Sequence, residues 1–599
     1  MALTVYQLKV GGKLLTPPTD RAHATRISVS HLVPLLEFNH NPIFGHDGHR
    51  FDHSGDCLEK GAHCGDPMSR ARKTHRFCKE KRKSMTKETY MKMEVGRRTF
   101  LKGVGMLAAS SVATGNAVLA ANTLDGKPGQ GESQFAEKPK PIISGPSQAE
   151  GIAKFATRTN YEDLTPERRE RLKVSILDSL ACAINALGAP PITACQAQAK
   201  EFGGSDGRCT LIGGGKANVV YAAQFNTALV RYVDFMDSYL AGEEICHPSD
   251  NVGAVLAACE HAGRSGKEFL TALAVAYQVE SVLTANAPFM ADGFDLTTQL
   301  SFSVAAGASK ALRLDEAKCG AAVEMCGSFI PLLVVRTTPI SQWKGLNSSQ
   351  IALGSIHGVF LASRGVTGPK YVIEGPNGLA QALGRSIQVD WDQVKLDCFD
   401  RLSLKSYNSA VPTQSAIFCT LELHKADPFD PADVVSIEAE VFQDAYDFTG
   451  GGRFGPKKNV HTKEDADHSL PYLLAVGLLD GDVQPAQLEP SRISKSDVQD
   501  LLQKVTVRPN EGFTARYPAE VPSRVTVRLR SGRVFTHEVS DYPGASNRPF
   551  TWKEIEAKFD KLAASHASGK SGQTIKNAVR SLEDIQVNDL MKALSQLNG

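Results

Sequence analysis

Hydrophobic residues recur at helical spacing through a long central part of the chain. The clearest example has four apolar residues on one predicted helix face: Leu172, Ile176, Leu180 and Ile184. Thr165 can cap this helix, Pro166 suits its first turn, and Gly188 suits its end. Further helical patterns cover residues 254–262, 268–285, 301–312, 317–326 and 350–364.

The pattern changes after about residue 395. Residues 434–441 and 505–509 resemble strands, and residues 523–539 alternate on either side of Ser531-Gly532, as in a β-hairpin. From Thr551 the helical pattern returns. We therefore predict a mainly α protein with an inserted α+β lid domain. The predicted parts are a helical domain at 147–395, the lid at 396–548, and C-terminal helices at 549–599 that return to the helical domain.

The first part of the chain has a different character. Residues 1–84 show no sustained helical or strand period, and we interpret them as a mis-assigned or disordered N-terminal extension. Met85, Met91 and Met93 lie just before Arg97-Arg98, and we expect the true start to be one of them, within a signal-like segment at 85–121. Residues 122–146 are rich in Gly, Pro and Lys and are predicted to be a linker.

The segment at 85–121 has the design of a twin-arginine export signal. Arg97-Arg98 precede Phe100-Leu101-Lys102, an uncharged and weakly apolar run, and small residues that end at Ala121. A buried helix or a membrane anchor is the alternative, but the run is short and rich in Gly, Ser and Ala. We expect a bacterial protein that the twin-arginine machinery exports to the periplasm, with no stable membrane insertion after cleavage.

Charge and cysteine content narrow the function classes. Residues 1–121 hold 19 Lys and Arg against 10 Asp and Glu; because the whole chain carries +2, the remainder carries −7. A mildly acidic body argues against nucleic acid as a partner. Nine cysteines follow residue 121 without any CxxC pair, which indicates buried thiols and not a disulfide framework or zinc site.

One polar stretch, "VDFMDSYLAGEEICHPSDN" at 233–251, is the candidate for chemistry. Its carboxylates and its single histidine are compatible with a metal site, an acid–base site or a polar loop. No His pair at helical i,i+4 spacing supports a metal site, and common phosphate, dinucleotide and zinc-protease motifs are absent from the sequence.

Six blocks in order along residues 147–560 resemble the MmgE/PrpD family, which includes 2-methylcitrate dehydratase and cis-aconitate decarboxylase. They are the stretch above, "GFDLTTQLSFSVAAGASKALRL", "QWKGLNSSQIALGSIHGVFLASRGVTGP", "SLKSYNSAVPTQSAI", "EDADHSLPYLLAVGLLDG" and "RYPAEVPSRVTVRLRSGRVFTHEVSDYPG". The resemblance implies a helical domain with an α+β lid, a homodimer, and chemistry on small di- or tricarboxylates without metal or cofactor.

The resemblance also implies site residues. Those that fall on the family's catalytic positions are Asp234, Ser238, His247, Lys344 and Lys405. We expect further substrate contacts from Arg336, Gln414, His468 and Tyr472. An imidazole can move a proton to or from carbon near neutral pH, and lysine ammonium groups can hold carboxylates.

Two positions depart from the family pattern. Family members usually carry a histidine where Leu296 stands, and another where this chain reads Ala410-Val411-Pro412. We predict a lyase that removes water or CO₂ from a small polycarboxylate. A dicarboxylate isomerase or epimerase on the same fold, and a non-catalytic carboxylate-binding protein, stay open as alternatives.

Overall fold

The computed structural model describes residues 9–10, 13–14, 140–204, 207–337 and 339–597. The predicted signal segment at 85–121, most of the linker and nearly all of the N-terminal extension lie outside these ranges. The chain forms two compact units, Met1–Gln130 and Gly131–Gly599. In the first unit, the described residues form two short antiparallel strands, β1 (Lys9–Val10) and β2 (Lys13–Leu14).

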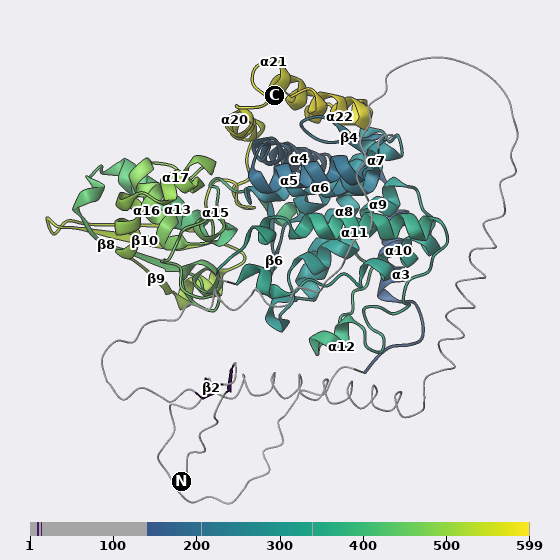
Figure 1. Ribbon diagram of the computed structural model, residues 1–599, viewed down its shortest axis with the longest axis horizontal. Coiled ribbons are helices and arrows are strands. Elements are labelled where there is room, and N and C mark those ends of the chain that lie inside the picture. Colours follow the sequence, from purple (N-terminus) through teal and green to yellow (C-terminus); the bar gives the residue numbers. More distant parts are fainter. Residues whose placement is uncertain (1–8, 11–12, 15–139, 205–206, 338, 598–599) are drawn as a thin grey trace, which may run out of the picture. The chain divides into compact units, whose positions relative to one another are not determined.

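A bundle of helices forms most of the second unit (Figure 1). The predicted helix after Thr165 is confirmed as α4 (Pro166–Asn185), and the Thr165 side chain accepts a hydrogen bond from the Arg168 amide. All four of its predicted apolar residues are fully buried, because their spacing places them on the face that meets the core.

The other helices of the bundle follow in chain order. They are α3 (Gln148–Arg158), α5 (Pro190–Phe202), α6 (Val219–Tyr232), α7 (Val252–His261), α8 (Gly266–Asn286), α9 (Thr297–Ala311), α10 (Glu316–Cys326), α11 (Asn347–Ser363) and α12 (Leu379–Leu383). Among the described residues, no single helix is long and apolar enough to cross a membrane, although α4 and α5 pass the same test as a bent pair.

A four-stranded sheet dominates the C-terminal part, in the order β11-β10-β8-β9. Its strands are β8 (Val434–Val441), β9 (Val505–Pro509), β10 (Ser523–Leu529) and β11 (Val534–Val539). The predicted hairpin is confirmed, because β10 pairs antiparallel with β11 around a turn in which Gly532 has a φ of +85°. Strand β9 joins the sheet parallel to β8, which the sequence pattern did not predict.

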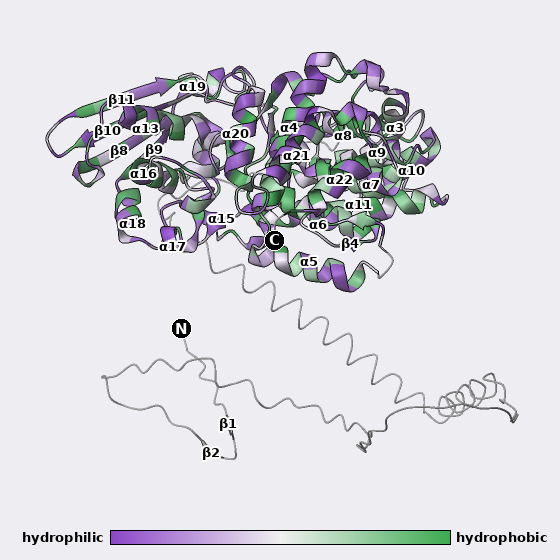
Figure 2. Cartoon of the chain, turned by 90° about the horizontal axis from the view of Figure 1, so that it is seen from above, coloured by the Kyte–Doolittle hydropathy of each residue, from purple (hydrophilic) through white to green (hydrophobic). Residues whose placement is uncertain are grey.

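Alternation along β10 follows the pleat of this sheet. Val525, Val527 and Leu529 are buried, while the residues between them are partly or fully exposed. Figure 2 shows that both hydrophilic and hydrophobic residues occur along the helices and strands of this part. The helices that accompany the sheet are α13 (Gln414–Ala426), α14 (Gln443–Ala445), α15 (Lys463–Ala466), α16 (Leu470–Asp480), α17 (Pro490–Ile493), α18 (Ser496–Gln503) and α19 (Glu511–Arg516).

After the sheet, the chain returns to the helical bundle through α20 (Trp552–Ala563), α21 (Lys570–Arg580) and α22 (Val587–Ser595). Helix α20 packs on α4, and Lys558 of α20 lies 2.6 Å from the buried Asp178 carboxylate. The same ammonium donates to the carbonyls of Phe235 and Lys405, at 2.8 and 2.9 Å. The C-terminal return therefore ties together two loops that carry predicted site residues.

The predicted mainly helical class is confirmed, with its larger sheet confined to the C-terminal part. The predicted burial of the cysteine thiols is also confirmed within the described residues. The nine cysteines described are all buried and free.

Candidate active site

The candidate site begins where α6 ends. Asn218 caps the start of α6 by accepting from the amides of Val220 and Tyr221, and two residues after the helix comes Asp234. Asp234 has a φ of +55°, in the left-handed region that few residues other than glycine adopt. Such backbone strain of about 1–3 kcal/mol is typical of functional turns.

Two lysines from distant parts of the chain meet the Asp234 carboxylate. Lys344 Nζ donates to Asp234 Oδ2 at 2.6 Å, and Lys405 Nζ donates to Oδ1 at 2.8 Å. Lys405 also donates to the Asp234 carbonyl at 2.8 Å. All three side chains are buried, so the structure brings three of the five predicted catalytic residues into one ionic cluster.

A small three-stranded sheet positions the loops around this cluster. Strand β5 (Ser238–Leu240) lies between β6 (Ile245–Cys246) and β7 (Leu402–Ser403), all in antiparallel pairing. Asp234 precedes β5, His247 follows β6 and Lys405 follows β7. Lys344 comes instead from the short 3₁₀ turn η6 (Gln342–Gly345).

His247 is held in one tautomer. Its Nδ1 lies 2.8 Å from the Asp237 carbonyl, which can only accept, so Nδ1 donates and Nε2 carries the lone pair. Ser238 Oγ lies 3.2 Å from the same nitrogen. Burial, with Arg231 and Lys405 nearby, keeps the pKa of His247 well below its usual range. Its imidazole is therefore neutral at neutral pH and can act as a base.

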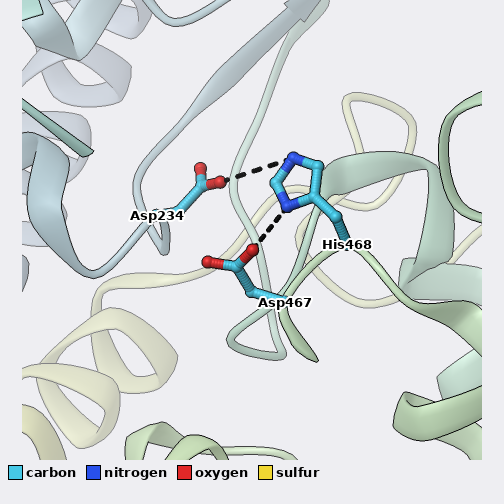
Figure 3. A group of neighbouring side chains, drawn as sticks. All are labelled: Asp234, Asp467 and His468. Atoms are coloured by element: carbon cyan, nitrogen blue, oxygen red, sulfur yellow. Dashed lines mark hydrogen bonds and ion pairs between the residues drawn. The ribbon is translucent and has the colours of Figure 1, made fainter. Parts of the chain in front are cut away.

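A second histidine joins the cluster from the C-terminal part of the chain (Figure 3). His468 Nδ1 donates to Asp467 at 2.5 Å, and its Nε2 lies 3.9 Å from Asp234 Oδ2. Lys463 lies 3.0 Å from the other Asp467 oxygen, and Lys344 Nζ lies 3.4 Å from His468 Nδ1. Burial, together with Lys344, lowers the pKa of His468 to about 4.

The ionisation of the two carboxylates follows from the same contacts. Burial alone would raise the pKa of Asp234, but Lys344, Lys405 and Arg231 outweigh it and hold that pKa well below its usual range. Lys344 and Lys463 similarly lower the pKa of Asp467 against the effect of burial. Burial lowers the pKa of Lys344 and Lys405, although their carboxylate partners oppose that shift.

These groups border one small cavity. Its polar lining comes from Asp234, His247, Arg336, Lys405 and His468. Its apolar lining comes from Ile245, Met290, Leu296, Ala410, Val411, Pro412 and Phe448. Leu296 and residues 410–412 stand where family members usually carry histidines. Both therefore belong to the apolar lining of this cavity.

The predicted substrate contacts divide into two groups. Arg336 lines the cavity and forms a buried ion pair with Asp295, and His468 lines it as described. Gln414 lies outside the lining, since its amide bonds to the backbone of Ser406 and Tyr407 and holds the loop after Lys405. Tyr472 also lies outside, and its hydroxyl donates to the Gln487 carbonyl.

The other acidic residues of the 233–251 stretch have separate roles. Asp237 accepts from the Ser175 hydroxyl and the Ser249 amide, which anchors the loop. Glu243 is exposed, whereas Glu244 is buried and accepts from the Phe289 amide. Burial raises the pKa of Glu244 to about 8, so this carboxyl is largely protonated at neutral pH.

Sequence reasoning did not single out Asp467 or Arg231. Arg231 is almost fully buried and lies 3.6 Å from Asp234 and 3.9 Å from Asp250. Asp467 stands directly before His468 in "DHSLPY", and an acidic residue beside a candidate histidine is the signal that could have found it.

Part of this cluster has the residue types of a metal-binding group. Among the described residues, Asp234, Asp467 and His468 have ligand atoms within 4.8 Å of one another. However, Lys344 and Lys405 already contact Asp234, and Lys344 and Lys463 contact Asp467. A divalent cation bound to these carboxylates would be repelled by the three ammonium groups that already contact them, so the charge of this cluster suits an anion better.

A larger cleft borders the same cluster from another side. It is lined by residues that include Val233, Gln342, His461 and Lys463. Neither His247 nor Lys405 lines this cleft, whereas the smaller cavity combines His247 with the cations Lys405 and Arg336.

Comparison with known proteins identifies the family of this chain. Residues 150–392 match the MmgE/PrpD N-terminal domain, and residues 407–584 match the MmgE/PrpD C-terminal domain. The chain belongs to the MmgE/PrpD family.

Individual relatives are distant. The chain is 25% identical over 452 residues to the 2-methylcitrate dehydratase-like protein oryR of Aspergillus oryzae. These aligned residues cover 69% of this chain and 89% of that protein. It is 24% identical to human cis-aconitate decarboxylase, over 61% of this chain and 77% of the enzyme. It is 23% identical to 2-methylcitrate dehydratase of Escherichia coli K12, over 64% and 83% respectively.

Proposed function

We propose that this protein is a metal-independent lyase that removes water, or CO₂, from a small di- or tricarboxylate. One observation carries the proposal: His247, whose Nδ1 is used by a backbone carbonyl so that Nε2 keeps its lone pair, lines the same cavity as the buried cations Lys405 and Arg336. The family membership and the names of the relatives, which are dehydratases and a decarboxylase, support the same reaction class.

The cations of the lining favour a substrate that carries a carboxylate. An ammonium group has three N–H donors, and Lys405 uses two of them on Asp234. Since Lys405 lines the cavity, its third donor is available to a substrate carboxylate. Lys405 and Arg336 would then stabilise the negative charge that builds up on that carboxylate when the neighbouring carbon loses a proton.

His247 supplies the base in this proposal. Its Nε2 takes the proton from the carbon next to a carboxylate, and the electron pair of that C–H bond forms the C=C bond as the C–O bond to the hydroxyl breaks. Ser238 and the Asp237 carbonyl hold the ring so that Nε2 keeps its lone pair.

The test is turnover of a substrate panel by the full chain. Citrate, 2-methylcitrate, cis-aconitate and simpler hydroxy-dicarboxylates would be incubated in D₂O and followed by proton NMR. The proposal expects an unsaturated acid, or a decarboxylated one, from at least one of them. Deuterium incorporation without net loss of water or CO₂ would favour the isomerase or epimerase, for which the second neutral imidazole, His468, is the supporting observation. Binding without any exchange would favour a carboxylate-binding protein.

We also propose that the sheet-containing part, approximately residues 396–548, acts as a lid over the helical domain. In support, His468 comes from this part, whereas Asp234 and His247 come from the helical bundle, so the cluster closes only when both are in place. A homodimer is proposed on the family resemblance alone. Light scattering of the full chain would test it.

Export to the periplasm is a further proposal, supported by the sequence pattern of residues 97–121. In a bacterial host, the chain started at Met93 should appear in the periplasmic fraction. The double substitution Arg97→Lys and Arg98→Lys should abolish that export, and unchanged fractionation would count against a twin-arginine signal.

A further inference from the structure

Elimination needs a proton donor as well as a base, and the proposed function leaves that donor unassigned. The hydroxyl group leaves as water only if a proton reaches its oxygen. Among the described lining residues of the cavity, His468 is the second imidazole. It lies between α15 and α16, just before the Ser469 side chain that caps α16 by accepting from the Tyr472 amide.

The two histidines differ in what holds their Nδ1 atom. His247 donates to a backbone carbonyl, which is neutral, at 2.8 Å. His468 donates to the Asp467 carboxylate at 2.5 Å, and a second carboxylate, Asp234, lies 3.9 Å from its Nε2. Because a carboxylate stabilises a neighbouring imidazolium far more than a carbonyl does, a proton in this cavity is better placed on His468 than on His247.

In the ligand-free protein, two effects keep the His468 imidazole neutral. Its ring is buried, and Lys344 lies 3.4 Å from Nδ1, so both burial and the ammonium charge oppose protonation. A polycarboxylate in the cavity that His468 lines adds negative charge near this buried ring, where little water remains to screen it. Substrate binding therefore favours the protonated form of the His468 imidazole.

We propose that His468, positioned by Asp467, is the proton donor of this site and takes up its proton as the polycarboxylate binds. This inference rests on the proposed lyase function. As His247 removes the carbon-bound proton and the C–O bond breaks, His468 Nε2–H transfers its proton to the departing hydroxyl oxygen, and water is released. His247 then returns its proton to solvent, and His468 takes up another with the next substrate.

Several charged or titratable groups face His468 or its carboxylate partner. From the helical part these are Asp234, His247, Arg336, Lys344 and Lys405, and from its own part Lys463 and Asp467. Of the two carboxylates, Asp467 makes the closer contact with the ring. Its replacement should therefore weaken the donor without removing it.

Calorimetry can measure proton uptake directly. Propane-1,2,3-tricarboxylate lacks the hydroxyl group, so it can bind without elimination. Its binding to the full chain would be titrated at pH 7 in two buffers with different heats of ionisation. The inference expects uptake of about one proton per site. It also expects uptake to disappear in His468→Gln, with binding retained, and to decrease in Asp467→Asn.

Turnover supplies the second measurement. His468→Gln should lower kcat by about 10²–10⁴-fold with a much smaller change in KM, and Asp467→Asn should lower it by about 10-fold or more. His357→Gln, a change at an exposed histidine on α11, is the control and should leave kcat and proton uptake unchanged. Circular dichroism and Tm would establish that each variant is folded.

The outcomes separate this inference from the function on which it rests. If the tricarboxylate binds to the native chain without proton uptake, or if His468→Gln leaves uptake or kcat unchanged, His468 is not the donor, whereas the lyase function stands. If no polycarboxylate binds and none is turned over, the proposed function fails, and the inference fails with it.

Discussion

The cavity has cationic and apolar lining residues, called here its cationic wall and its apolar wall, and these differ in what they can recognise. One wall presents Lys405 and Arg336, whose charges are set by buried ion pairs with Asp234 and Asp295. The other presents aliphatic and aromatic side chains, including Leu296 and Val411. A fully ionic site would accept any small polyanion, whereas this combination favours a carboxylate that also carries an apolar group.

His247 belongs to the polar lining of the same cavity, and its loss should have the largest effect. His247→Gln should lower kcat by about 10²–10⁴-fold with little change in KM, because it removes the base and keeps an amide of similar size. Steady-state kinetics on the substrate found in the panel would measure this. His357→Gln on the exposed face of α11 is the control, and equal activity of the two variants would remove His247 from the mechanism.

The cationic wall should be the next most sensitive. Lys405→Met should reduce kcat/KM by about 10²–10³-fold, because it removes a charge that stabilises the developing anion. It should also destabilise the fold by about 3 kcal/mol, because Asp234 loses one of its buried partners. Kinetics and denaturant unfolding would test both effects against Lys425→Met, whose side chain is 78% exposed. Full activity in Lys405→Met would contradict the proposed carboxylate contact.

The apolar wall should affect selectivity more than rate. Leu296→Ala should lower the ratio of kcat/KM for 2-methylcitrate to that for citrate by about 10-fold, since one lost apolar contact is worth about 1–3 kcal/mol. Competition between the two substrates would measure the ratio. Leu361→Ala at a partly exposed site should leave it unchanged. An unchanged ratio in Leu296→Ala would show that Leu296 does not contribute to recognition of the methyl group of 2-methylcitrate.

The smallest expected effect concerns the carboxyl groups behind the two walls. Behind the apolar wall, the pKa of Glu244 is raised to about 8, while an unfolded chain ionises Glu near pH 4.3. The unfolded state therefore binds fewer protons between these values, and Glu244 costs stability progressively as the pH rises from about 4 to 8. Glu244→Gln should raise Tm relative to the native chain by about 2 °C more at pH 8 than at pH 5.

Behind the cationic wall the sign is reversed. The pKa of Asp467 is lowered by Lys344 and Lys463, so its contribution to stability is present above the unfolded value near 3.9 and is lost as the pH falls through the folded value. Asp467→Asn should therefore cost more Tm at pH 7 than at pH 3. Thermal scans in which the two variants show the same pH trend would contradict the different electrostatics of the two walls.

Much of the fold could be predicted from sequence because local patterns match it. Strand β8 and the hairpin follow the alternation of their residues, and the Thr165 cap and apolar face define α4. The parallel pairing of β9 with β8 could not be predicted, since it depends on a contact between segments about 70 residues apart. Periodicity specifies a strand but not its neighbour.

Only part of the candidate site could be predicted from the sequence, for a similar reason. The family resemblance identified Asp234, Lys344 and Lys405, but their mutual contacts depend on how loops 110 and 171 residues apart are brought together. Gln414 is a plausible ligand in sequence, yet its amide is used by the backbone of its own loop. The contact between Asp467 and its neighbour His468 depends on side-chain orientation, which residue type does not determine.

The most direct test of the central claim is the enoate absorbance of the full chain mixed with the polycarboxylate panel, measured with and without chelator. The proposed mechanism predicts that absorbance rises with at least one hydroxy-acid, is unaffected by the chelator, and is abolished in His247→Gln. Absorbance that depends on added metal, or that persists in His247→Gln, would contradict it.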